Sequence, residues 1–174
     1  MKTITSKRLL LKSISKLDIQ QIHKLHSQPM VDRFNTLGIP ENLRDTENII
    51  VLWLEGNDLV FRIELKSNKS FIGLIALIPG NPKFKRAEVW YKVYPDFWNN
   101  GYGTEALQII LDYGFKELGL HRIEAGCAVE NFGSIRVLEK VGMKREGRKR
   151  QVLPLKDGWS DSFEYAILST DFNG

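Results

Sequence analysis

The feature that most constrains this chain is an almost unbroken apolar run at residues 71–78. The run contains no charged residue, and its single glycine is Gly73. Successive side chains of a strand point to opposite faces of a sheet, so a strand that is apolar at every position must be covered on both faces. We therefore expect residues 71–78 to form an interior strand that is buried on both faces.

The segments around this run predict a sheet of mixed order. Residues 59–65 alternate apolar and polar side chains, and a turn at residues 66–69 joins them to the run as an antiparallel pair. Residues 87–94 predict a third strand that Pro95 ends. Further strands are expected at residues 8–12, 121–129, 144–153 and 162–168, and helices at 17–30, 46–54 and 134–141. This order is typical of neither an all-β chain nor a purely βα one.

A glycine-containing loop, residues 99–106, precedes another helical pattern that ends near Gly119. Gly101 and Gly103 flank Tyr102 there. Glycine allows φ > 0, and the first turn of a helix leaves about four N–H groups without partners, so the loop has the features of a phosphate site. The side chains expected on the buried face of this helix are Leu107, Ile110, Leu111, Phe115 and Leu118, with Glu105, Gln108, Asp112 and Lys116 on another side. An ordinary loop and helix start would carry the same short motif.

Composition and charge bound the class of protein. A chain of 174 residues that is 43% hydrophobic fits one sizeable core, and no repeat or linker divides it, so we expect residues 1–174 to form a single domain. No apolar stretch reaches the ~20 residues of a membrane span, and residues 1–16 lack a signal-peptide core, which favours a cytoplasmic protein without membrane contact. The net charge of +4 resides in residues 144–150, and either a phosphate-bearing partner such as RNA or a solvated strand edge would explain it.

Two nucleotide-binding motifs compete for the glycine loop. Gly101-x-Gly103-x-x-Ala106, with Glu124 about 20 residues on, fits the dinucleotide fingerprint. That fingerprint requires several further βα units, which the rest of the chain does not supply. A Walker loop is excluded because no Gly-Lys-Ser/Thr follows at the required spacing.

Several segments together resemble the GNAT acetyltransferase superfamily. Residues 98–106, 113–115 and 118–123 are similar to its acetyl-CoA-binding core. Residues 131–143, followed by Glu146-Gly147-Arg148, are similar to the Rim-type branch of ribosomal-protein N-terminal acetyltransferases. The resemblance extends to residues 8–11 and to Gly158, and so covers almost the whole chain. It implies an α/β GNAT fold, in which a mixed, mostly antiparallel central sheet is split at its middle and flanked by helices.

The resemblance also implies where coenzyme A binds. Trp98 stands where the family usually has Gln or Arg, so a side-chain donor to the phosphates is lost. The backbone N–H donors of the loop remain, and they belong to Asn100, Gly101, Tyr102, Gly103 and Thr104. These groups would cradle the pyrophosphate. The pantetheine arm would lie in a split between the strands ending near Val93 and Val129, and backbone N–H near Val93 would polarise the thioester carbonyl.

Acyl transfer to an amine requires a neutral nucleophile, whereas an α-amine has a pKa of about 8 and lysine one of about 10.4. Glu88 is the candidate base, because strand alternation places it with Trp90 on one face upstream of the thioester position. A surface carboxylate paired with Lys or Arg is the alternative. Asp161 is the second candidate for the base.

The remaining candidates lie at a helix start and on one strand. The resemblance implies that Ser134 protonates the departing thiolate and that Asn131 hydrogen-bonds the cofactor arm, although both residue types are also strong N-caps. His121 and Cys127 would lie about 20 Å apart on an extended strand, so we expect a buried cysteine and no catalytic pair. His23 and His26 lack a third ligand, so an exposed helix face is expected and no metal site.

The predicted reaction is direct acetyl transfer from acetyl-CoA to a primary amine, with a ribosomal protein N-terminus as the first acceptor class. The acceptor wall is expected within residues 27–54, where Arg33, Phe34 and Trp53 are available. A small-molecule amine and a non-catalytic module that binds CoA or RNA are the alternatives. Direct nucleic-acid binding is the less favoured of these, and a homodimer rests on the resemblance alone.

Overall fold

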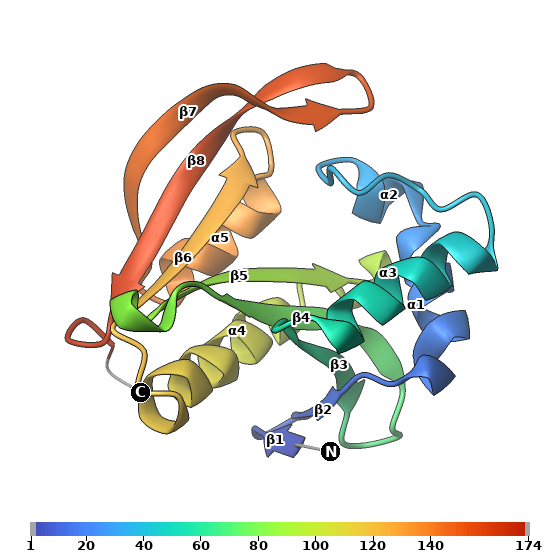
Figure 1. Cartoon of the computed structure of the whole chain (residues 1–174), viewed down its shortest axis with the longest axis horizontal. Coiled ribbons are helices and arrows are strands. Elements are labelled where there is room, and N and C mark those ends of the chain that lie inside the picture. Colours follow the sequence, from blue (N-terminus) through green and yellow to red (C-terminus); the bar gives the residue numbers. More distant parts are fainter. Residues whose placement is uncertain (1–2, 173–174) are drawn as a thin grey trace.

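The computed structural model describes residues 3–172 and has an α/β architecture (Figure 1). The strands are β1 (Thr3–Thr5), β2 (Leu9–Ser13), β3 (Leu59–Leu65), β4 (Phe71–Pro79), β5 (Arg86–Val93), β6 (Arg122–Ala128), β7 (Lys144–Leu155) and β8 (Gly158–Leu168). The helices are α1 (Ile19–His26), α2 (Pro29–Asp32), α3 (Leu43–Glu55), α4 (Tyr102–Asp112) and α5 (Phe132–Lys140). Short helical turns are η1 (Lys16–Asp18), η2 (Pro82–Phe84), η3 (Pro95–Phe97) and η4 (Tyr113–Glu117).

The eight strands found among residues 3–172 form one sheet in the order β1-β2-β3-β4-β5-β6-β8-β7. All neighbours are antiparallel except β5 and β6, which are parallel only where Arg86, Ala87 and Glu88 face Arg122, Ile123 and Glu124. Beyond this short pairing the two strands diverge (Figure 1). The predicted mixed, mostly antiparallel sheet with a split at its middle is confirmed. A single parallel pair does not build the doubly wound sheet of the dinucleotide alternative.

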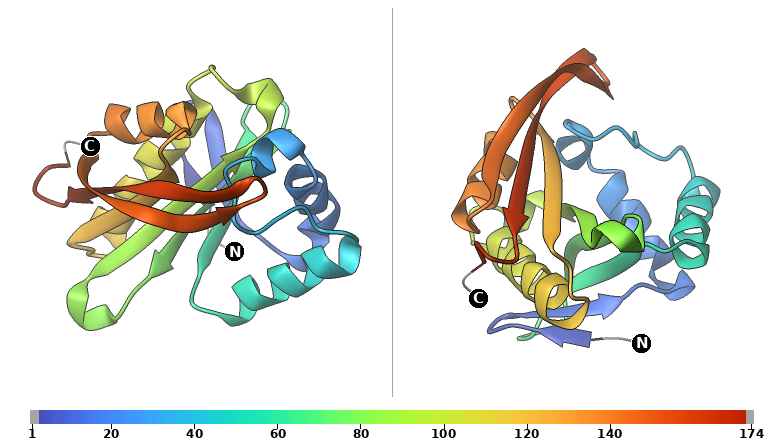
Figure 2. Two further views of the ribbon diagram at one scale, coloured as in Figure 1. Left: turned by 90° about the horizontal axis from the view of Figure 1, so that it is seen from above. Right: turned by 60° about the vertical axis from the view of Figure 1, so that its left-hand side comes forward.

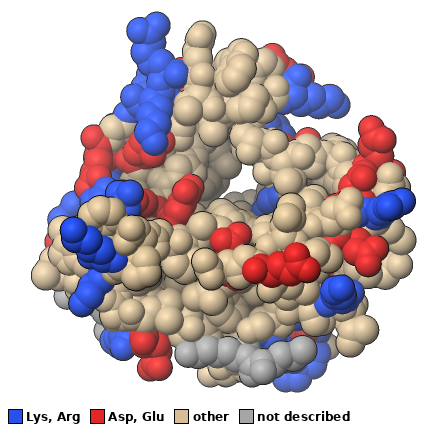
Figure 3. All heavy atoms as spheres, in the orientation of Figure 1, with Lys and Arg blue, Asp and Glu red and all other residues tan. Residues whose placement is uncertain are grey.

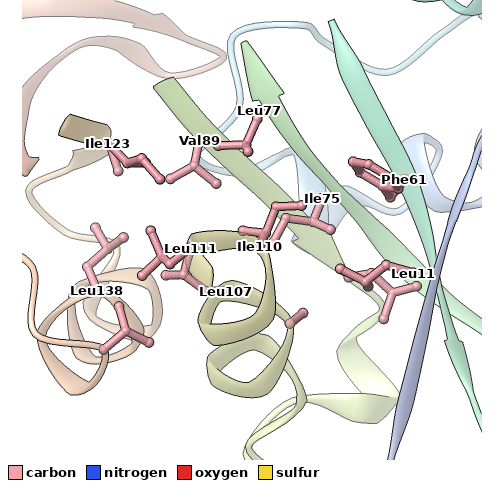
Figure 4. Close-up of a cluster of buried hydrophobic side chains, with 14 of the residues drawn as sticks. Leu11, Phe61, Ile75, Leu77, Val89, Leu107, Ile110, Leu111, Ile123 and Leu138 are labelled. Atoms are coloured by element: carbon pink, nitrogen blue, oxygen red, sulfur yellow. The ribbon is translucent and has the colours of Figure 1, made fainter. Parts of the chain in front are cut away.

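Helices cover both faces of the sheet, so the interior position predicted for residues 71–78 is confirmed. On β4, Leu74 and Ala76 join the cluster beneath α1 and α3, whereas Ile75 and Leu77 face α4. Figure 4 shows the larger cluster, in which sheet residues meet side chains of α4 and α5. Its labelled members are Leu11, Phe61, Ile75, Leu77, Val89, Leu107, Ile110, Leu111, Ile123 and Leu138.

The helix predicted for residues 17–30 is wrong in extent, because the chain breaks there into η1, α1 and α2. Gln28 is extended and Pro29 begins α2, as expected of proline, which disfavours helical geometry at the residue before it. Leu17, which the pattern grouped with Ile22 and Leu25, is 90% exposed in η1. The prediction that both histidines lie on an exposed face is also wrong, since His26 is only 2% exposed.

Several other elements also differ from their predictions. Helix α3 begins at Leu43 instead of residue 46, because Asn42 accepts the N–H groups of Arg44 and Asp45 as its N-cap. Leu118, predicted on the buried face, is 39% exposed beyond η4. Strand β1 was not predicted, and β7 and β8 extend to form a long hairpin that rises past the split on the side of α2 (Figure 2).

Candidate functional site

The loop before α4 has the geometry of an anion site. Gly101 is the N-cap residue at φ +76°, and Asn99 also adopts a left-handed conformation at φ +60°. Gly103 lies within the first helical turn, so its lack of a side chain does not serve a positive φ there. The N–H groups of Tyr102, Gly103 and Thr104 belong to this first turn and have no partner within the helix. They and the helix dipole provide the donors that a pyrophosphate requires.

An ion pair between Arg8, near the N-terminus, and Glu105 fixes this loop. Arg8 donates through Nε to Glu105 Oε2 at 2.6 Å and through Nη1 to the carbonyl oxygen of Asn100 at 3.0 Å. Ser6 Oγ donates to Glu105 Oε1 at 2.6 Å, and the Arg8 guanidinium lies over the Tyr102 ring. These hydrogen bonds lower the pKa of Glu105 against the effect of burial. Arg8 thereby offsets a negative charge at the helix end that would otherwise repel phosphate.

The strand end at Val93 directs its backbone groups into the split. Tyr94 N–H donates to Ile72 O at 2.9 Å, and Val93 is paired with Gly73. Hydrogen-bonded and non-hydrogen-bonded pairs alternate along an antiparallel ladder, so Val93 N–H and C=O point away from β4. Trp98 Nε1 donates to Val93 O at 2.7 Å. The indole donor therefore fixes the strand end.

A cleft of about 1220 Å³ runs through the split and past the loop. The cleft is lined by residues within the segment 30–37, which we call the α2 region, and by Trp53 of α3, β5, the glycine loop, β6 and α5. A second cavity of about 600 Å³ adjoins it, and Glu88, Ala125 and Gly126 line both. Figure 3 shows the molecule hollowed between the β7–β8 hairpin and the helices of the α2–α3 side. Ligands can therefore approach the split from two directions.

Glu88 stands at the junction of the two cavities. It is the last residue of β5 paired with β6, directly beside Glu124, and its side chain is exposed. Reduced hydration, followed by the carboxylates of Glu164 and Glu124, raises the pKa of Glu88 above its ordinary value. Glu124 and Glu164 form ion pairs with Arg122 and Lys149, whereas no ion pair of Glu88 occurs among residues 3–172.

Asp161, the second candidate for the base, lies outside the described walls of both cavities. It accepts from Gln151 N–H at 2.8 Å and from Arg148 Nε at 2.6 Å, and these bonds lower its pKa. Arg148 belongs to the basic segment 144–150, where Lys144 contacts Asp171 and Lys149 contacts Glu164. These pairings along an exposed edge strand favour the solvated-edge interpretation of the charge cluster.

Ser134 lies at the start of α5, on the face of β5 that carries Tyr91 and not on the face that carries Glu88. Asn131 Oδ1 accepts its backbone N–H at 3.1 Å, so the predicted capping role of Asn131 is present. Ser134 Oγ is 2.9 Å from the Tyr91 hydroxyl on β5 and also interacts with Cys127 on β6. Burial raises the pKa of both the Tyr91 phenol and the Cys127 thiol, the latter to about 11. Cys127 is buried, as predicted, and both groups stay protonated near neutral pH.

The residues predicted for the acceptor wall line the cleft on the side of α2 and α3. Trp53 and Trp90 have ring centroids 5.4 Å apart, and His26 contacts the Trp53 ring edge. Desolvation lowers the pKa of His26 to about 3, so this histidine is neutral. Phe34 and Arg33 also line the cleft. His23 Nδ1 instead lies 2.8 Å from Thr46 Oγ1.

Two features that other classes of site require do not occur among residues 3–172. Residues 3–172 hold no group of three or more His, Cys, Asp or Glu side chains that could ligate a metal. No helix in the same range is long and apolar enough to cross a membrane.

Sequence reasoning did not single out Tyr91 and Lys92, which the structure places in the cleft. Strand alternation separates Tyr91 from Glu88, Trp90 and Lys92, and this signal was available in the sequence. The contact of Tyr91 with Ser134 could not be predicted from the sequence, because it depends on how α5 packs beside β5.

Comparisons with known proteins agree on one family. Residues 8–144 match the description "Acetyltransferase (GNAT) domain". The uncharacterized N-acetyltransferase YnaD of Bacillus subtilis is 35% identical over 98% of this chain and 99% of its own length. The crystal structure of a GNAT-family acetyltransferase from Bacillus anthracis superposes with a TM-score of 0.87 at 32% identity, covering 97% of this chain and 99% of that one.

Two more distant structures share the fold and contain coenzyme A. The spermidine N-acetyltransferase of Vibrio cholerae, in complex with CoA and spermine, has a TM-score of 0.87 at 24% identity, covering 95% of this chain and 98% of that one. RimL, a ribosomal L7/L12 α-N-protein acetyltransferase in complex with CoA, has a TM-score of 0.86 at 19% identity, covering 96% and 98%.

Proposed function

The chain belongs to the GNAT acetyltransferase family and is an N-acetyltransferase that uses acetyl-CoA, and we propose that its acceptor is the N-terminal α-amine of a protein. The observation that carries this proposal is the position of Glu88 where the cofactor cleft meets a second cavity. An amine entering from that cavity meets a carboxylate of raised pKa beside the split. A ribosomal protein is the first acceptor class to test.

The residues present fit acetyl-CoA, which supplies an activated acetyl thioester when bound. The left-handed Gly101 and the free N–H groups of the first α4 turn suit its pyrophosphate. Val93 N–H, directed into the split, is available to donate to the thioester carbonyl. Asn131 lines the same cleft and is available to the pantetheine arm.

Glu88 acts as the general base in this proposal. An α-amine with a pKa of about 8 is mostly protonated at neutral pH and must lose a proton before it attacks. The raised pKa of Glu88 makes it a stronger base than an ordinary carboxylate, and its exposure allows a direct or water-mediated transfer. The ion pair to Arg148 makes Asp161 the weaker candidate.

Ser134 stabilises the departing thiolate, and Tyr91 positions it. A short contact of 2.9 Å joins the two hydroxyl oxygens. The raised pKa of Tyr91 keeps its proton in place, so Tyr91 can donate to Ser134 Oγ. The serine hydrogen can then turn from Cys127 to the sulfur of the cofactor. Direct transfer then needs neither a metal nor a covalent enzyme intermediate.

The exposed apolar wall of the cleft supports a polypeptide acceptor. The wall contributed by the α2 region exposes apolar side chains, among them Met30 and Leu37, beside the aromatic Trp53. Such a surface suits residues that follow a protein N-terminus. The similarity of residues 131–148 to the Rim-type branch supports the same acceptor class.

A competition assay tests the proposal. Purified protein and acetyl-CoA are mixed with equal concentrations of ribosomal-protein N-terminal peptides, the same peptides with a blocked α-amine, and spermidine, and products are identified by mass spectrometry. We expect acetylation of the free peptides at the α-amine and none of the blocked peptides at that position. Preferential acetylation of spermidine would replace the proposed acceptor class with polyamines.

A further inference from the structure

Within residues 3–172, the ammonium of one lysine in the cleft has an aromatic neighbour but no ion-pair or hydrogen-bond partner. Lys92 lies on the same face of β5 as Glu88 and Trp90, and its side chain lines the cleft. Its Nζ lies 5.8 Å from the centroid of the Trp90 ring. No hydrogen bond or ion pair to Nζ occurs among residues 3–172. An ammonium with reduced hydration and no ionic partner favours an incoming anion.

The groups behind Lys92 keep it charged without neutralising it. Burial lowers the pKa of Lys92 to about 8, while the negative charge of Asp32 opposes this shift, so the ammonium form predominates at neutral pH. Asp32 is only 8% exposed, and its Oδ1 has no hydrogen-bond partner. It lies outside the described wall of the cleft and beyond ion-pairing distance of Lys92. His26 is the other ionisable neighbour, and it is neutral.

Two charges of opposite sign lie on one face of β5 along the cleft. Glu88 faces the junction with Glu124 and Glu164 nearby, whereas Lys92 lies four residues farther along β5, about 13 Å away for an extended strand. Arg33, whose guanidinium lies over the Phe34 ring, adds a second cation on the Lys92 side. A second positive charge on the acceptor would meet repulsion here, and a negative charge would find a donor.

From this arrangement we propose that Lys92 binds a carboxylate of the amine acceptor, and that the enzyme selects acceptors with an acidic group close to the reacting amine. The inference rests on the proposed function, since it concerns the acceptor of that reaction. Lys92 precedes Val93 directly, so the carboxylate belongs within the first residues of a peptide or is the α-carboxylate of a free amino acid. Both sources present the same chemistry to the ammonium.

The test uses matched peptides that begin Ser-Glu, Ser-Gln and Ser-Lys, together with free glutamate and spermidine, at one ionic strength. For wild type we expect kcat/KM for the Ser-Glu peptide to exceed that of the Ser-Gln peptide by roughly tenfold or more, as for a hydrogen bond to a charged group. The Lys92→Met variant keeps the stem over Trp90 and should reduce this ratio to about one. Lys92→Arg should retain the preference, and Lys83→Met, at an exposed cation of η2, is the matched control.

Each other outcome separates this inference from the proposed function. Equal rates for the three peptides would overturn the role of Lys92 and leave α-amine acetylation intact. A Ser-Glu preference that survives in Lys92→Met would assign recognition to another residue. Faster turnover of glutamate than of any peptide would keep the carboxylate chemistry and identify a small acceptor, whereas faster turnover of spermidine would overturn both proposals.

A binding measurement decides the case in which no acceptor is turned over. Trp53 and Trp90 line the cleft, so quenching of tryptophan fluorescence reports an occupied acceptor wall. Tighter binding of the Ser-Glu peptide to wild type than to Lys92→Met would support the carboxylate site without any turnover. Equal binding by both proteins would reject it, and thermal unfolding confirms that each variant is folded.

Discussion

Removal of one hydroxyl group tests how the leaving group is served. Tyr91→Phe deletes only the oxygen that lies 2.9 Å from Ser134 Oγ and leaves the ring in place. A neutral hydrogen bond contributes about 0.5–1.5 kcal/mol, which corresponds to about a two- to twelvefold loss of rate. We expect the loss in kcat, with KM for acetyl-CoA nearly unchanged. Because Tyr91 stays protonated, the loss should be constant between about pH 6 and 9.

The assay follows release of the free thiol of CoA over a range of acetyl-CoA concentrations. Ser134→Ala and the double variant complete a mutant cycle, and Tyr91→Phe should cost nothing more once Ser134 is absent. Tyr94→Phe is the control, since its hydroxyl donates to Gln21 O at 3.3 Å on the other face of β5. Fully additive losses, or an unchanged kcat in Tyr91→Phe, would refute the positioning role.

Three further predictions follow from the site and its support. Glu88→Gln should lower kcat/KM by about a hundredfold or more at neutral pH. The deficit should shrink as pH rises, because the acceptor amine then loses its proton unaided. Wild-type activity should fall as pH drops through the raised pKa of Glu88, since the base must be ionised. Glu124→Gln should keep this fall but move it to lower pH, because it removes a carboxylate that raises the pKa of Glu88. Arg8→Ala should weaken acetyl-CoA binding in calorimetry, whereas the adjacent exposed Lys7→Ala should not. Gly73→Ala would place a Cβ 2.1 Å from a backbone carbonyl oxygen of β5. Its free energy of unfolding should therefore fall by at least about 1–3 kcal/mol, which thermal unfolding would detect.

Local sequence patterns predicted most of the fold because their causes are local. The apolar run at residues 71–78 had to be an interior strand. The alternation at residues 59–65 predicted a neighbouring strand with one polar face. Helix limits were less accurate, since Pro29 and the Asn42 cap act through backbone geometry that hydrophobic period does not report. The burial of His26 depends on its packing against Trp53, which comes from a separate helix.

The candidate site was predictable where a motif carried it and hidden where it depended on tertiary contacts. The glycine loop and the pair Asn131 and Ser134 could be read as motifs. The Arg8 ion pair to Glu105 joins residues 97 positions apart, and no local pattern reveals it. The half-buried position of Lys92 in the cleft depends on tertiary packing around β5, which no local pattern reveals.

A single-turnover experiment tests the central claim most directly, namely that the acetyl group passes straight from acetyl-CoA to a free amine. Excess protein is mixed with acetyl-CoA and an N-terminal peptide, and the masses of peptide and intact protein are followed in time. The account predicts that the peptide gains one acetyl group at its α-amine while the protein mass stays unchanged, with or without peptide. An acetylated protein that forms before the product and then decays, or hydrolysis of acetyl-CoA with the peptide unmodified, would contradict it.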